Sequence, residues 1–454
     1  MEKECDVLVV GGGPAGVIAS YVAVKEGKSV YLTDTKIYEQ IGNKTCGDAL
    51  SLEHTEFLKE KTGIDHPTGK EVSDTIDTLI LATEKIELPI NLPGYVVDRH
   101  IYGQRLLKIA ELEGVSILPQ MKALRSYIKG ETVIGAYFKN LETKKEEIIK
   151  SKVTIDCSGA SFILRKTLPK GRFRKIETNL LQDEIVPSYR EIIRLRDDHP
   201  YHNKIYLIYD NSIPQPGYFW FFSKGKNELN AGIGWKLSKD EKGNSMRKVY
   251  REILHKYYSP DSYEILDGRG YIIPLRYPLL NHVANGFLTA GDAACHVDPS
   301  TAEGHGPALV AGYFAGLQAS QAIEGGEATT ERLWNYNKNI FMNFGLNHLK
   351  KQLLTDVITS IKMEGVDFIF KRKILTTEEF SNISEGGNLN ILSILEKIIR
   401  SSPHWGYLFK LRTFSKGMKI LPDFFNRYPS SPHSYNSWLN EFFPWYQSIR
   451  NKIL

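Results

Sequence analysis

The sequence predicts an α/β fold with three parts: a parallel-sheet domain, an inserted antiparallel sheet and a helical C-terminal region. Three observations predict it. A glycine-rich turn at residues 11–16 stands between a short apolar run and a segment of small residues. Segments rich in aromatic and β-branched residues follow between residues 170 and 280. From residue 331 onward the chain has the pattern of amphipathic helices, with many aromatic residues and lysines.

The glycine-rich turn has the surroundings of a Rossmann-type dinucleotide site. The apolar run at residues 7–10 predicts a buried strand, residues 17–26 predict a helix, and residues 29–33 predict a second strand. Asp34 follows the second strand, about 20 residues beyond the turn, where an acid accepts a hydrogen bond from a ribose hydroxyl. This pattern predicts dinucleotide binding, but it does not distinguish FAD from NAD.

Each glycine of the turn has its own predicted task. Gly11 permits the tight turn, Gly13 lets the backbone approach a pyrophosphate, and Gly16 lets helix and strand pack closely. The N-terminus of the helix then offers free N–H groups and the positive end of its dipole to the phosphates.

The composition is that of an ordinary globular protein. The 454 residues, 42% hydrophobic and 24% charged, allow two or three domains. The net charge of +5 permits contact with an anionic membrane, and no basic cluster with interleaved aromatics predicts nucleic-acid binding. The four cysteines do not have the spacing of a metal site. Because we find no secretory leader and no apolar run of roughly 20 residues, we expect a cytoplasmic protein.

Changes of pattern divide the chain into four segments. We expect the nucleotide-binding domain to comprise two parts, residues 1–170 and residues 281–330, with small inserted strands at about 65–97 in the first part. We expect an antiparallel-sheet substrate domain at residues 171–280 and a helical region at residues 331–454. The helices of that last region are expected at residues 332–344, 346–362, 391–399 and 441–453.

Two polar side chains have more than one interpretation. Cys46, within a compact stretch of small residues, is either a redox or acid thiol or a small buried filler. Arg99 stands at the start of a predicted helix, where it either binds a phosphate or forms a surface salt bridge.

Aromatic residues dominate residues 214–222. On a strand, Tyr218, Trp220 and Phe222 share one face. They form either an aromatic wall beside a cofactor, which suits an apolar or planar substrate, or ordinary hydrophobic core.

Two later stretches repeat the pattern of a strand that ends at a glycine-containing turn. One strand ends at Asp156. The other ends before Asp292, whose carboxylate can accept a hydrogen bond from a ribityl hydroxyl or order a water near a phosphate. Gly304 and Gly306 open a long helix, and its N-terminus suits the electron-rich edge of a reduced flavin.

Taken together, these motifs resemble those of the flavoprotein family of aromatic hydroxylases, halogenases and geranylgeranyl reductases. Their order and spacing are specific for FAD and cover about the first 330 residues. Within that family, residues 44–50, residues 214–222 and the pair Asp98–Arg99 are similar to geranylgeranyl reductases, above all to the archaeal digeranylgeranylglycerophospholipid reductases. One position departs from that group, because Ser223 follows Phe222 where proline is usual.

The resemblance implies an FAD-dependent reductase that hydrogenates the C=C bonds of geranylgeranyl chains in archaeal membrane lipid biosynthesis. It also implies which residues contact FAD. To these we add four glycines of the glycine-rich turns: Gly11, Gly13, Gly16 and Gly306. The contacts implied by motif match are Ala15, Asp34, Cys46, Gly47, Ala49, Arg99, Asp292, Gly304 and His305, and Ala123 is added from its position in the pattern.

The chemistry that the resemblance implies needs an acid and a group that stabilises positive charge beside the reduced flavin. An isoprenoid alkene is unactivated, so hydride from a reduced flavin must be accompanied by a proton from an acid. Tyr218 and Trp220 are expected to stabilise the cation-like carbon through their ring faces. Cys46, or a water near Cys46 and His305, is the predicted proton source.

Two other functions remain open. The first is an FAD monooxygenase or halogenase of the same fold, and the second is a non-enzymatic prenyl-lipid carrier, against which the intact flavin motifs argue. No second G-x-G-x-x-G is present, so the expected electron donor is ferredoxin-like, or else NAD(P)H. A lipid substrate implies peripheral contact with the inner face of the membrane.

Overall fold

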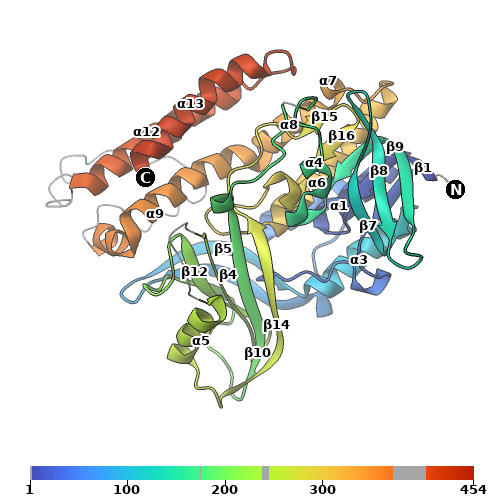
Figure 1. Ribbon diagram of the computed structural model, residues 1–454. Coiled ribbons are helices and arrows are strands. Elements are labelled where there is room, and N and C mark those ends of the chain that lie inside the picture. The colour runs from blue at the N-terminus through green and yellow to red at the C-terminus, as the bar shows by residue number, and fades with distance from the viewer. Residues whose placement is uncertain (1–2, 174, 238–244, 372–404) are drawn as a thin grey trace.

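The computed structural model describes residues 3–173, 175–237, 245–371 and 405–454. Two eight-stranded sheets lie beside each other, and a set of long helices extends from them at the end of the molecule far from the N-terminus (Figure 1). The expected helix at residues 391–399 lies outside the described residues.

The first sheet is the nucleotide-binding sheet. At its centre β1 pairs in parallel with β2 on one side and with β9 on the other, and β16 adds a fourth parallel strand beside β9. Its central strands are apolar because both faces of the sheet are covered. The carboxyl ends of these strands meet at one edge, where ligands bind in such sheets. The strands are β1 (Lys3–Val10), β2 (Val30–Thr33), β6 (Ser116–Leu118), β7 (Met121–Lys129), β8 (Thr132–Asn140), β9 (Glu146–Asp156), β15 (Val283–Ala284) and β16 (Phe287–Thr289).

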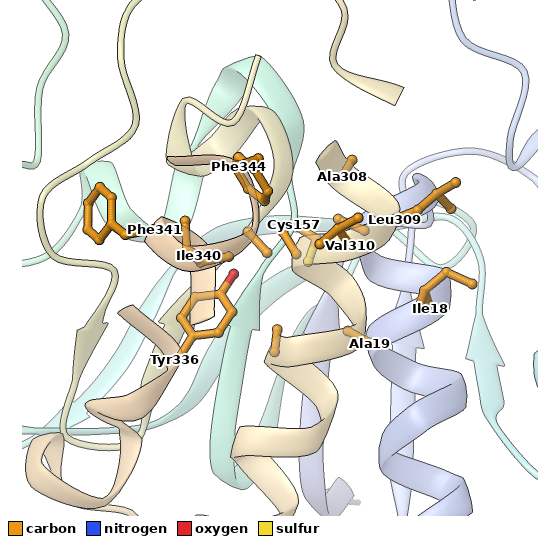
Figure 2. Packing of buried hydrophobic residues seen from close by; sticks show 14 of the residues in the cluster. Ile18, Ala19, Cys157, Ala308, Leu309, Val310, Tyr336, Ile340, Phe341 and Phe344 are labelled. Atoms are coloured by element: carbon orange, nitrogen blue, oxygen red, sulfur yellow. The ribbon is translucent and has the colours of Figure 1, made fainter. Parts of the chain in front are cut away.

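Helices α1 (Pro14–Lys25) and α6 (His305–Glu324) pack together at unusually short range. A Cβ atom on Gly312 would lie 2.4 Å from the carbonyl oxygen of Ala15, so only glycine permits this approach. Figure 2 shows α6 with α1 on one side and the ring of Tyr336 on the other. The two sequence-distant helices thereby form one layer beneath the first sheet.

The second sheet combines segments from three parts of the chain. Its order is β14-β10-β13-β12-β11-β4-β5-β3, and every neighbouring pair is antiparallel except β4 and β11, which are parallel. The strands are β3 (Ala49–Ser51), β4 (Val72–Ala82), β5 (Glu87–Val97), β10 (Ile185–Leu195), β11 (Lys204–Ile208), β12 (Gly217–Ser223), β13 (Glu228–Trp235) and β14 (Tyr263–Pro274).

Helix α5 (Met246–Tyr257) covers one face of this second sheet (Figure 1). Phe219 and Phe221 of β12 pack on that side with Tyr250 of α5; the ring centroids of Phe219 and Tyr250 are 5.4 Å apart. The alternate residues of β12 therefore point to the opposite face, toward the first sheet. The remaining helices around the two sheets are α2 (Leu52–Thr62), α3 (Arg99–Leu112) and α4 (Ile163–Lys166).

The C-terminal helices pack against one another through aromatic rings and buried polar contacts. The Tyr446 hydroxyl donates to the carbonyl oxygen of Leu349 at 2.8 Å, and Arg450 pairs with the buried Asp356 at 2.6 Å. These contacts fix the last helix against α9. The helices are α7 (Thr330–Leu333), α8 (Asn335–Ile340), a π-helical turn (Phe341–Gly345), α9 (Leu346–Lys371), α12 (Trp405–Asn426) and α13 (Tyr435–Ile453).

The predicted fold class is confirmed, with differences in the second sheet. The strands expected as a small insertion at about 65–97 belong to the second sheet, because β4 pairs with β11. That pair also makes the sheet mixed, where an antiparallel one was expected. Strands β10 and β14 were not predicted. Of the two, β14 is largely exposed and shows no apolar run. The domain limits themselves stay a prediction.

Candidate active site

A cavity of about 1250 Å³ lies between the two sheets. The loops at the carboxyl edge of the first sheet form one end, and the face of the second sheet opposite α5 forms the other. Side chains of α9, among them His348, Lys351 and Leu354, close a third side. The cavity therefore brings the glycine-rich turn and the aromatic strand into one site.

The glycine-rich turn has the shape of a phosphate cradle. Gly11 has a φ of +111°, and a Cβ atom there would lie 2.2 Å from the carbonyl oxygen of Cys157. A Cβ atom on Gly16 would lie 1.9 Å from the carbonyl oxygen of Gly11. A Cβ atom on Gly13, in contrast, would meet no other described atom within 4 Å. Gly11 and Gly16 are thus needed for packing, and Gly13 leaves room for a ligand.

Asp34 binds the turn from the end of β2. Its carboxylate accepts hydrogen bonds from the backbone N–H groups of Gly12 at 2.8 Å and of Lys36 at 2.9 Å. Asp34 is only half-buried and lines the cavity, so it can accept a further hydrogen bond from a ligand hydroxyl.

Two cations line the same region. Lys44 Nζ lies 2.6 Å from Asp292 Oδ2 and 4.8 Å from the centroid of the Tyr271 ring. Burial opposes the charge on Lys44, but the Asp292 carboxylate outweighs it and raises the pKa of the ammonium group. Arg99 is buried, and within the described ranges no carboxylate lies at ion-pairing distance from it. Its burial favours the phosphate-binding interpretation over a surface salt bridge, and that role stays a prediction.

The N-terminus of α6 opens into the cavity without a side-chain cap. Gly304 is the capping residue, and His305 follows it. Burial, with Arg99 and Lys44 close by, holds the pKa of His305 well below its ordinary value, so the ring is neutral. Its Nδ1 atom is buried and has no hydrogen-bond partner within the described part of the chain. The uncapped N-terminus of α6 and the unpartnered His305 Nδ1 lie next to each other. Together they suit the polar edge of a ligand's ring.

The loop that carries Cys46 is fixed to the aromatic strand by Asn230. The Asn230 side chain donates to the Cys46 carbonyl oxygen at 2.7 Å and to Asp48 Oδ2 at 3.0 Å. It also accepts from the Trp220 indole N–H at 3.1 Å. The Cys46 thiol is half-buried in the cavity wall, and Arg99 Nη1 donates to its Sγ at 3.5 Å. Cys46 is therefore exposed to a ligand and is not a fully buried filler.

Tyr218, Trp220 and Phe222 share one face of β12, as the two-residue period of a strand predicted, and all three line the cavity. Trp220 and Phe222 also belong to the main hydrophobic core. These two side chains are therefore part of the cavity wall and of the core at the same time. The Tyr218 hydroxyl donates to the carbonyl oxygen of Thr301 at 2.6 Å, which fixes the ring against the loop before α6. At the position of the sequence departure, Ser223 continues β12, and its hydroxyl donates to the carbonyl oxygen of Gly225.

Most of the predicted site residues meet in this cavity. Two of them, Gly16 and Gly306, do not line it. Gly16 packs under the turn. Gly306 packs against His54, and a Cβ atom added to Gly306 would lie 2.0 Å from His54 Nδ1. Those that line the cavity are Gly11, Gly13, Ala15, Asp34, Cys46, Gly47, Ala49, Arg99, Ala123, Tyr218, Trp220, Asp292, Gly304 and His305. Their individual roles stay predictions.

Several polar side chains of this site were not predicted from the sequence. Lys44 stands two residues before Cys46, and its ion pair with Asp292 spans nearly 250 positions of sequence. His54, Lys351 and Asn230 belong to no motif. The folded chain brings His54 and Lys351 to the cavity and places Asn230 behind its wall, against the Cys46 loop.

Family comparisons agree with this geometry. A family model described as FAD dependent oxidoreductase matches residues 6–167, and one described as geranylgeranyl reductase catalytic domain matches residues 184–270. A digeranylgeranylglycerophospholipid reductase from Sulfolobus acidocaldarius is 30% identical to the chain over 446 residues, which cover 97% of each protein. The chain belongs to the geranylgeranyl reductase family. It is an FAD-dependent oxidoreductase, and the phosphate cradle, the uncapped α6 and the unpartnered His305 fit that cofactor.

Solved structures share the fold of this geranylgeranyl reductase family member. A geranylgeranyl bacteriochlorophyll reductase-like protein from Thermoplasma acidophilum has a TM-score of 0.75 at 19% identity and covers 91% of this chain and 100% of its own. A flavin-dependent brominase has a TM-score of 0.65 at 17% identity, with coverage of 89% and 99%. At these identities the likeness concerns the fold alone.

In the described ranges, no group of three or more His, Cys, Asp or Glu side chains is arranged to hold a metal ion. No described helix combines the length and the apolar content that crossing a bilayer requires.

Proposed function

We propose that this chain uses FAD to hydrogenate the C=C bonds of geranylgeranyl chains in a membrane lipid precursor. One observation carries the proposal: a single cavity joins a dinucleotide cradle to an apolar, aromatic-walled chamber. The 30% identity with a digeranylgeranylglycerophospholipid reductase over 97% of both chains supports the substrate class.

The chamber beside the cradle suits an isoprenoid chain. Strands β4, β5 and β11 and helix α9 each contribute aliphatic side chains to its walls. Such a surface binds a hydrocarbon by removing both from water. The aliphatic residues used in this argument are Leu79, Leu81, Ile90, Ile205, Leu207 and Ile358.

The proposed reaction adds a hydride and a proton across an alkene. FAD, when bound and reduced, supplies the hydride. The protein has to stabilise positive charge at the more substituted carbon and to provide the proton. The Tyr218 and Trp220 rings, with centroids 6.1 Å apart in an edge-to-face pair, support the first task through cation–π attraction. For the second, the acid must line the cavity, as Cys46 does.

The electron donor and the location of the protein are also proposals. We propose a ferredoxin-like donor, or NAD(P)H, and contact with the inner face of the membrane from the cytoplasm. Helix α12 supports the membrane contact. Its exposed residues Trp405, Phe409, Arg412 and Lys416 are three or four positions apart, so they form one stripe along the helix. Aromatic rings at the interface and basic groups near anionic headgroups are typical of peripheral binding.

An anaerobic assay tests the proposed function. The purified protein is reduced with dithionite and mixed with a geranylgeranyl phospholipid or geranylgeranyl diphosphate, and flavin absorbance is followed together with the mass of the lipid. We expect flavin reoxidation with a gain of two hydrogen atoms for each double bond reduced.

The same assay distinguishes the alternatives. A flavin that stays reduced until oxygen is admitted, and then yields a hydroxylated product, would assign the protein to the monooxygenase branch. Lipid binding by a protein that carries no flavin would favour a prenyl-lipid carrier.

A further inference from the structure

His54 lines the cavity at the start of α2, outside every predicted motif. Its ring packs directly on the first turn of α6, since Nδ1 occupies the space that a Cβ atom on Gly306 would need. Glu303 lies on the other side, with Oε1 at 3.4 Å from His54 Nδ1. The side chains of His54 and Glu303 are 15% and 23% exposed, so both remain open to the cavity.

The loop that carries Glu303 also positions the aromatic wall. Its Thr301 carbonyl oxygen accepts the Tyr218 hydroxyl at 2.6 Å, two residues before Glu303. The loop is rigid at its base, where the backbone N–H of Asp298 donates to the carbonyl oxygen of Glu303 at 2.8 Å. The His54–Glu303 pair and the Tyr218 ring are therefore held by one short loop on the same cavity.

Charged groups surround the pair from three elements. Glu53 of α2 is exposed at the edge of the cavity, Asp298 belongs to the Glu303 loop, and Lys351 of α9 pairs with Asp298 at 2.6 Å. Two neutral rings complete the surroundings, His305 of α6 and His348 of α9, both with pKa values lowered by burial. Burial also disfavours the charged form of His54, but Glu303 outweighs it and raises the pKa of the imidazole.

We infer that His54, held against Glu303, is the acid that protonates the substrate alkene. The inference rests on the proposed function and assigns its proton donor. The structure offers a half-buried carboxylate beside His54, which keeps an imidazolium in place, whereas His305 is neutral and has no such partner. An ordinary imidazolium, with a pKa of about 6.5, is also a stronger acid than an ordinary thiol at about 8.5.

The step balances as a two-electron reduction of the alkene. The π bond is lost and two C–H bonds form, one from the hydride that the reduced flavin supplies and one from the His54 proton. The His54 N–H bond breaks, its electron pair stays on nitrogen, and the neutral ring takes a proton from solvent at the cavity edge near Glu53. The flavin is oxidised and is reduced again by the electron donor.

A chemical titration tests the pair without any turnover. Diethyl pyrocarbonate acylates only the unprotonated imidazole, so the rate of His54 modification against pH, read by peptide mass spectrometry, gives its titration in the full-length protein. We expect the midpoint to fall to lower pH in Glu303→Gln. An unchanged midpoint would overturn the pairing.

The rate of alkene reduction by pre-reduced protein tests the acid itself. We expect the wild-type rate to fall as pH rises through the His54 titration, because the acid must be protonated. His54→Asn should lose about 100-fold at pH 7 and lose that pH dependence, the size expected for a general acid. In Glu303→Gln the decrease in the rate of alkene reduction should occur at lower pH than in the wild type.

Controls separate this acid from its alternatives. Cys46→Ala should keep the wild-type pH dependence, and His66→Asn should keep both rate and pH dependence, since His66 contacts Thr55 Oγ1 outside the cavity wall. The flavin spectrum of each variant shows that the cofactor site is intact. If His54→Asn keeps the wild-type rate while Cys46→Ala loses it, the acid is the thiol and the inference is wrong. If the unmodified protein reduces no lipid, the proposed function fails, and this assignment fails with it.

Discussion

At the scale of single residues, the three glycines of the turn show how one motif divides its tasks. Gly11 and Gly16 are surrounded by backbone, and a side chain on either would collide with it. Gly13 has free space around its α-carbon. The sequence assigns all three to one site, but only Gly13 leaves the space that a ligand would fill.

This difference predicts opposite effects for two alanine substitutions. Gly13→Ala should leave the free energy of unfolding of the apoprotein unchanged but weaken FAD binding at least tenfold, because the methyl group occupies the ligand's space. Gly16→Ala should destabilise the apoprotein by about 1–3 kcal/mol, since the turn must shift. Urea unfolding and flavin titration measure the two effects. Equal losses of stability in both variants would contradict this division.

Asn230 is the residue that joins the aromatic wall to the Cys46 loop. It is fully buried and uses its amide for the Trp220, Cys46 and Asp48 contacts. Asn230→Ala leaves these groups unpaired, which should lower the free energy of unfolding by about 1–3 kcal/mol. We also expect slower alkene reduction at saturating substrate, because Trp220 is released. The matched control Asn227→Ala, which loses one contact to Leu195 away from the cavity, should affect stability less and leave the rate unchanged.

At the scale of secondary-structure elements, the contact between α1 and α6 decides the position of both helix N-termini at the cavity. Gly312 lies where the two helices cross. A Cβ atom added to Gly312 would lie 2.4 Å from the carbonyl oxygen of Ala15. Any added side chain must push the helices apart, and the first turn of each would move with them.

Gly312→Ala should therefore destabilise the protein by about 1–3 kcal/mol and weaken FAD binding as well. The control is Gly406→Ala in α12, where a Cβ atom would meet no described atom within 4 Å. That variant should be stabilised by up to about 1 kcal/mol, the usual gain of alanine over glycine in a helix. Chemical unfolding of both variants makes the comparison, and a neutral Gly312→Ala would show that the helices can separate.

At the scale of the whole molecule, the C-terminal helices connect the catalytic cavity with the proposed membrane surface. Helix α9 lines the cavity with Lys351 and Leu354, and α12 and α13 pack on it. The exposed stripe of α12 lies on this assembly. A lipid substrate that leaves the membrane here would meet the helices that border its chamber.

The exposed stripe of α12 predicts lipid binding that depends on its two aromatic rings. The double variant Trp405→Ser/Phe409→Ser should bind vesicles of anionic phospholipid at least tenfold more weakly in a flotation assay, because two interfacial rings are lost. The control Met342→Ser changes an apolar side chain that is 82% exposed elsewhere, and it should bind as the wild type does. Raised salt should weaken binding of all three proteins through Arg412 and Lys416. Equal binding by the double variant would contradict the proposed surface.

Local patterns were enough to predict the nucleotide-binding half of the protein. The strand–turn–helix around Gly11, the acid at Asp34 and the capped start of α3 at Asp98 each depend on residues close in sequence. The face shared by Tyr218 and Trp220 follows from the two-residue period of a strand. Such features need no knowledge of distant segments, so they are found before the fold is known.

The rest depends on contacts between distant segments. No local pattern pairs β4 with β11, places Lys44 on Asp292 or turns His54 toward Glu303, because each contact joins residues more than a hundred positions apart. The sequence by itself determined the cofactor class, the reductase family and the aromatic strand, since these are written in short motifs. Only the tertiary structure decided which polar side chains share the cavity, because burial and pairing arise when separate elements pack together.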